Sequence, residues 1–183
     1  MKLPDFLKYN RTAAIAALIV VILAAVPLGT LRSVGSLQRK VEKIYDTGDN
    51  KNGTVRTDLT RLSDYGQNLY AIADSLGCAD ANFADSVAAL RASLDSPLME
   101  TDTVTALMSA ASLSYNRILN ALDIPESQKN SAISYFYEMD STRARLQNNK
   151  EYESAALRYN DAIETFPASL FCSAKDPAVT FAH

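Results

Sequence analysis

The feature that most constrains this chain is a 20-residue stretch without charge between Arg11 and Arg32, which reads TAAIAALIVVILAAVPLGTL. At a rise of about 1.5 Å per residue, a helix of this length measures roughly 30 Å, the thickness of a bilayer core. Its centre, from Ile15 to Val26, is apolar on every face and leaves no polar side for a surface helix. The stretch therefore predicts a transmembrane helix over residues 12–31, behind a short basic tail of residues 1–11.

A cleaved signal peptide and a buried core helix are the alternatives to a retained membrane helix here. The basic start (Lys2, Lys8 and Arg11) suits an anchor or a signal peptide. A cleavable signal has a short apolar region and an A-x-A-like site, whereas here the apolar run is long and Pro27 follows it without a convincing site. No cysteine follows the run, which excludes a lipoprotein. We favour a retained signal-anchor helix in a single-pass protein of the cell membrane.

The basic residues on the two flanks of this anchor give almost no indication of its orientation in the membrane. Three basic residues precede the segment, and four follow it closely: Arg32, Arg39, Lys40 and Lys43. The excess of basic residues that marks a cytoplasmic flank is therefore absent. A short basic N-terminus before an apolar run resembles an uncleaved export signal, so we expect the large domain outside the cytoplasm.

Apolar residues beyond the anchor recur at spacings of three and four, which is the period of an amphipathic helix. Leu31, Val34, Leu37, Val41 and Ile44 continue this period directly from the apolar stretch. One unbroken helix is therefore expected from the membrane segment to the turn-forming sequence near Gly48.

Further helices follow with recognisable starts and stops. The predicted helices run from Thr54 to a stop at Gly77, from Phe83 to Leu94 before Pro97, from Thr101 or Thr103 to Leu122, from Pro125 to Leu146, and from Tyr152 to Phe166 before Pro167. The polar sequence QNNKE between the last two is either a turn or a weak point of the helix. No segment has the alternation of a strand. We predict an all-α protein, in which residues 32–171 form an antiparallel up-down bundle of about four main helices. A C-terminal tail of residues 172–183 follows the bundle. The chain is expected to be loose after Pro167.

The inventory of reactive side chains indicates no enzyme, metal or cofactor site. The one histidine is the last residue, His183, and the cysteines Cys78 and Cys172 lie far apart, so a zinc site cannot be assembled. A disulfide between these cysteines and two unpaired thiols both stay open, with unpaired thiols the plainer interpretation. The chain carries a net charge of −3, and −5 without its first 31 residues, which disfavours nucleic-acid binding.

The carboxylates and tyrosines are expected to serve structure. Arg61 follows Asp58 by three residues, a spacing suited to an exposed ion pair. The late tyrosines Tyr135, Tyr137, Tyr152 and Tyr159 are typical of core and boundary packing. A groove for a ligand or peptide is the functional alternative for these tyrosines.

Three stretches of the chain resemble one known family. Near the C-terminus the sequence RYNDAIETFPASL places a Tyr-Asn pair on the last helix, followed by Phe-Pro, and this resembles the closing signature of the LemA family. The sequence Leu31-Arg32-Ser33-Val34, with Ser36-Leu37 after it, resembles the segment that leads out of the membrane. In the next helix, Asp58-Leu59, Arg61 and Asn68-Leu69 resemble the family's helix that carries "dL", "R" and "NL" in this order. The matching motif residues are Asp58, Leu59, Arg61, Asn68, Leu69, Tyr159, Asn160, Phe166 and Pro167.

The resemblance implies a membrane-anchored antiparallel helical bundle of bacterial type without catalytic residues. The motif residues are then expected to be structural. Asn68 and Asn160 would satisfy polar groups between helices, and Phe166-Pro167 would stop the last helix and cap the end of the bundle. We expect a non-enzymatic scaffold or interaction module with a protein partner at the membrane. The alternative is a sensor or small-ligand-binding bundle.

Overall fold

The chain is all-helical in the part that the computed structural model describes, residues 11–48, 54–98, 102–172, 175 and 177–181. These residues contain no strand and form seven helices: α2 (Arg11–Thr47), α3 (Val55–Ser75), α4 (Phe83–Ser93), α5 (Asp102–Asn120), α6 (Glu126–Asn148), α7 (Lys150–Glu164) and α8 (Ala168–Phe171). The predicted fold class, all-α with an N-terminal apolar helix, is confirmed.

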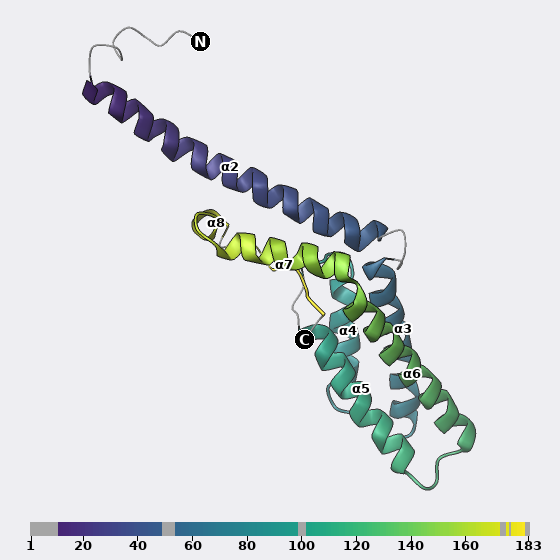
Figure 1. Cartoon of the computed structure of the whole chain (residues 1–183). Helices are drawn as coiled ribbons and strands as arrows, with labels where there is room; N and C mark the ends of the chain where they lie inside the picture. Colours follow the sequence, from purple (N-terminus) through teal and green to yellow (C-terminus); the bar gives the residue numbers. More distant parts are fainter. Residues whose placement is uncertain (1–10, 49–53, 99–101, 173–174, 176, 182–183) are drawn as a thin grey trace.

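Helix α2 is continuous from the uncharged stretch into the domain, as the apolar period predicted (Figure 1). It spans 37 residues and includes Pro27. Among the described helices it is the one with the length and composition to cross a membrane, and none of its most apolar window is buried against the rest of the chain. From Val34 onward one face becomes buried, and Val41 and Tyr45 are fully enclosed. The N-terminal half of α2 is therefore an exposed apolar segment, and its C-terminal half packs against the rest of the chain.

Helices α3 to α6 lie side by side and enclose most of the core (Figure 1). The most extensive contact joins α3 to α6, while α4 packs on α5 and both reach α3. Gly66 permits the close approach of α3 to α5, because a Cβ at this position would lie 3.3 Å from Cδ1 of Leu107. Helix α2 contacts mainly α7 and α8, and α3 only at its end. It is therefore not an equal member of this helix group.

The predicted polar break between the last two long helices is confirmed at Asn149. Helix α6 ends at Asn148, and the side chain of Asn149 accepts a hydrogen bond of 3.1 Å from the backbone N–H of Tyr152. This N-cap satisfies one of the free donors at the start of α7. The break allows α7 to leave the bundle and run back along α2 (Figure 1).

Several helix ends differ from the prediction by a few residues. Pro125 lies just before α6 rather than inside it, and α4 ends at Ser93. The helix expected to carry Phe166 ends at Glu164, and the four-residue α8 follows Pro167. Thr54 caps α3, and Gly77, with φ of 65°, ends it as predicted. Thr101, one candidate cap, lies outside the described residues.

The expectation of a loose tail after Pro167 is wrong for the described residues. Residues 178–181 are buried, and this C-terminal segment (residues 177–181) packs against the helices. The Asn160 side chain both accepts from the N–H of Ala178 at 2.8 Å and donates to its carbonyl at 2.9 Å. The N–H of Val179 donates to the carbonyl of Pro97. The sequence missed this docking because an extended segment held by backbone hydrogen bonds has no helical period.

Replacing Asn160 should loosen the C-terminal segment. Asn160→Ala removes both bonds to Ala178 and should lower the free energy of unfolding by about 1–2 kcal/mol. Trypsin should also cut faster after Lys175, which precedes the segment. Thermal unfolding in mild detergent and mass spectrometry of the digest measure the two effects.

Asn68→Ala is the matched control, because the Asn68 side chain is exposed on α3 and has no hydrogen-bond partner among the described residues. Its effect should stay within about 0.5 kcal/mol. Equal effects of the two substitutions would contradict the assigned role of Asn160.

Candidate interaction surface

The family-motif residues lie on separate elements and do not form one site. Five belong to α3, and the others lie on α7 or just after it, and these two helices pack mainly against different partners, α6 and α2. Leu59, Leu69 and Tyr159 are fully buried, Asp58 is nearly so, Asn160 and Pro167 are partly buried, and Arg61, Asn68 and Phe166 are exposed.

Two structural roles expected for these motif residues are not found. Asn68 is exposed and bridges no helices among the described residues. Phe166 is 75% exposed, so it does not cap the core. The stop near Pro167 is present, since α7 ends three residues before it. Asn160 does satisfy polar groups, but those of the C-terminal segment rather than of a neighbouring helix.

Asp58 joins α3 to α6 through Arg145. Its Oδ1 accepts from Nε of Arg145 at 3.3 Å and from Nη2 at 3.2 Å, and Nη2 also donates to the hydroxyl of Thr142. Arg61 is more distant, at 3.6 Å. The exposed Asp58–Arg61 pair that the sequence suggested is therefore only half correct: Asp58 is 7% exposed, and its closer partner comes from a helix 87 positions away.

Neutralising Asp58 should destabilise the α3–α6 contact. Asp58→Asn weakens the bonds to Arg145 and removes a favourable charge from the first turn of α3, so we expect a loss of about 1–2 kcal/mol in the free energy of unfolding. Guanidinium unfolding in micelles, followed by circular dichroism, measures this loss.

Asp64→Asn is the control, since Asp64 lies on α3 like Asp58 and pairs with Arg91 at 2.9 Å, but both of these side chains are more than half exposed. It should cost about 0.5 kcal/mol or less. Arg145→Gln combined with Asp58→Asn should cost less than the sum of the single changes. Additive effects of the two substitutions would contradict the coupling between Asp58 and Arg145.

Three aromatic side chains, Tyr45, Tyr152 and Phe181, form a buried cluster. Tyr45 and Tyr152 have ring centroids 6.3 Å apart, and Phe181 lies 5.8 Å beyond Tyr152. The hydroxyl of Tyr45 donates to the carbonyl of Leu94 at 2.9 Å, and burial raises the pKa of Tyr45 to about 12. Burial also raises the pKa of Tyr152, whose hydroxyl has no hydrogen-bond partner among the described residues. Both phenols therefore stay protonated at neutral pH.

The late tyrosines predicted as core or as a possible groove are dispersed. Tyr152 and Tyr159 are buried, whereas Tyr137 is exposed on α6. Tyr135 is partly buried and lies 6.5 Å from Tyr65, measured between ring centroids. The alternative of one tyrosine-lined groove is therefore not found among them.

Cysteine and metal chemistry can be judged over the described residues alone. Both cysteines are free thiols there, Cys172 buried and Cys78 partly buried. No group of three or more metal-ligating side chains occurs among these residues. Many polar side chains of this part of the chain take part in caps, turns and ion pairs, such as Thr54, Asn149 and Asp58.

A wide surface depression forms an open groove between α5 and α6. It has a volume of about 460 Å³ and mixes apolar and charged side chains. Phe136, in this lining, stacks on Tyr115 with centroids 4.3 Å apart. The lining residues are Thr105, Met108, Ser109, Ser112, Leu113, Phe136, Asp140 and Arg143. This groove is the candidate interaction surface.

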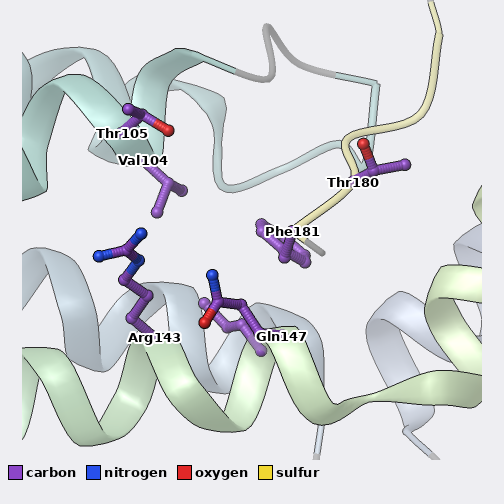
Figure 2. Close-up of a pocket in the computed structure, with 7 residues that line it drawn as sticks. Val104, Thr105, Arg143, Gln147, Thr180 and Phe181 are labelled. Atoms are coloured by element: carbon purple, nitrogen blue, oxygen red, sulfur yellow. The ribbon is translucent and has the colours of Figure 1, made fainter. Parts of the chain in front are cut away.

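A smaller cavity adjoins the groove and shares Thr105 and Arg143 with it. Figure 2 shows its walls: Arg143 and Gln147 on α6, Val104 and Thr105 on α5, and Thr180 and Phe181 on the C-terminal segment. Its volume is about 40 Å³. One water needs about 10–15 Å³, whereas ligand pockets measure about 300–1,000 Å³. The cavity therefore suits a few waters and not a metabolite.

Sequence reasoning missed the groove although one signal was present. Leu113 lies between Ala111 and Tyr115, off the regular stripe that runs from Val104 to Leu122. An apolar side chain on the other face of a helix is exposed unless something covers it, and Leu113 is exposed. Arg143 gave no comparable signal, because an arginine on a polar helix is ordinary.

Comparisons with known proteins give no match from which a function can be argued. The chain matches no protein-family model, no curated protein and no solved structure.

Proposed function

We propose that this chain is a single-pass, membrane-anchored helical bundle of the LemA type that acts without catalysis, as a scaffold or interaction module at a bacterial membrane. In this proposal residues 32–171 form the antiparallel up-down bundle, with α3 to α6 as its main group of helices. The observation that carries it is the single helix α2, bare and apolar at its start and packed from Val34 onward. Such a helix suits an element that leaves a bilayer and enters a folded domain.

The packing of α2 favours a retained anchor over a cleaved signal peptide. Val34 is already buried, only three residues after the uncharged stretch ends at Leu31. Cleavage near Gly29 would leave the packed part of α2 with a frayed start, because the first turns of a helix lack internal hydrogen bonds. A buried core helix is disfavoured by the exposure of Leu18, Val20 and Val21.

The groove between α5 and α6 supports an interaction role. Met108, Leu113 and Phe136 give it an apolar floor, with Asp140 and Arg143 beside them. A groove between two helices suits the apolar face of a third helix, and the charged pair would set its direction. We therefore propose a helical segment of a partner protein as its occupant.

The alternative is a sensor that binds a small ligand. The polar groups around the small cavity, Arg143 and Gln147 among them, favour it, and the volume of about 40 Å³ disfavours it. The absence of an internal histidine and of a metal-ligating group in the described part supports a non-enzymatic role over either a hydrolase or a transferase.

Photo-crosslinking in intact membranes tests the proposed function. With a photoreactive amino acid at Leu113, we expect a saturable adduct between the chain and a partner protein in the membrane fraction. The chain should also stay in the membranes during alkaline extraction. The same amino acid at Leu122, which is 95% exposed and outside the groove, should give no such adduct. Leu113→Arg should weaken capture of the partner at least about tenfold, the loss expected for a central interface residue.

Three results would count against this proposal. Release of the chain by alkaline extraction would contradict the anchor. Equal adducts at both positions would contradict the groove. Absence of an adduct together with thermal stabilisation by a metabolite would favour the sensor.

The orientation of the domain has its own test. Cys172 is buried, so an impermeant thiol reagent would fail to reach it on either side of the membrane. Leu122→Cys gives a fully accessible thiol instead, with Cys78→Ser as background. We expect labelling in intact cells, because the proposed domain lies outside the cytoplasm. Labelling only after permeabilisation would place it inside.

A further inference from the structure

Three exposed apolar side chains lie close together after α7. Phe166, Leu170 and Phe171 are 75%, 66% and 43% exposed, and we call them the α8 patch. They fall within six consecutive positions of the sequence TFPASLFC, which carries no charge. Contiguous exposed apolar side chains mark sites of interaction with proteins or membranes. We therefore expect another surface to cover this patch.

The antiparallel packing of α7 on α2 places this patch along the anchor. Tyr152 lies against Tyr45, and α7 then runs back along α2 (Figure 1). Glu164, the last residue of α7, follows Tyr152 by 12 positions, and Ser33 precedes Tyr45 by 12. Since both helices rise about 1.5 Å per residue, α7 ends near the level of Ser33, and Phe166 lies two residues beyond this end.

Direct contact between α8 and α2 supports the placement of the patch near the end of the uncharged stretch. The short helix packs against α2 beyond the end of α7 (Figure 1). On α2 itself, Leu28 and Leu31 are exposed in the same region, and Arg32 is the first charge after the uncharged stretch. The patch and the end of the apolar stretch therefore lie at the same height along α2.

We propose that the α8 patch is a second membrane contact, in which Phe166, Leu170 and Phe171 enter the outermost part of the bilayer beside α2. This inference rests on the proposed membrane anchor. The occupant is the lipid surface itself, because the patch continues the apolar surface of the anchor at the level where acyl chains meet headgroups. Two contacts, one spanning and one interfacial, would fix the tilt of the domain over the membrane.

Tryptophan fluorescence tests the contact in the full chain, which contains no tryptophan of its own. Leu170→Trp, with Phe166→Trp as a second probe, is reconstituted into phosphatidylcholine vesicles whose acyl chains carry bromine, a short-range quencher. Plain vesicles give the unquenched signal. We expect brominated lipid to quench most of the fluorescence at both positions, because an interfacial segment buries its apolar side chains about 5–10 Å into the headgroup and acyl boundary.

Two controls separate this contact from the anchor. Leu122→Trp, at the far turn between α5 and α6, should stay unquenched, and Leu18→Trp, within the uncharged stretch, should be quenched. Quenching at Leu18 but at neither patch position overturns the second contact and leaves the anchor intact. A patch tryptophan whose emission shifts with protein concentration but ignores brominated lipid also overturns it, since a second copy would then be the occupant. Absence of quenching at Leu18 overturns the anchor and, with it, this inference.

Discussion

The packing of the second half of α2 against α7 is the contact on which the rest of the structure depends. Val34, Val41 and Tyr45 are buried on α2, and Tyr152 and Tyr159 are buried on α7. This interface joins the apolar N-terminal half of α2 to the folded domain. Because the helix does not break between its two halves, any fixed position of the apolar half also fixes the domain.

The break at Asn149 makes this contact available. Asn149 ends α6 and caps α7, so the chain turns and the apolar face of α7 covers α2. The C-terminal segment then closes the junction, since Asn160 holds Ala178 and Glu153 accepts a hydrogen bond from the N–H of Phe181. A short polar sequence thus determines where the last fifth of the chain lies.

Two surface regions of the chain differ in their chemistry. The groove between α5 and α6 combines an apolar floor with Asp140 and Arg143, which suits a protein helix. The α8 patch is uncharged and lies along α2, which suits lipid. A chain that uses both would hold a partner at a set height above the membrane, and this is the physical content of the proposed scaffold role.

The sequence by itself determined the helical class, the uninterrupted α2, the break near Asn149 and the stop at Gly77, because each follows from local rules of period, capping and backbone conformation. Only the tertiary structure decided that α2 packs on α7, that Arg145 is the close partner of Asp58, that residues 178–181 are buried and that Leu113 and Phe166 are exposed. These features depend on contacts between residues far apart in the chain. No local pattern records such contacts, because burial of a side chain is decided by whichever distant helix comes to cover it.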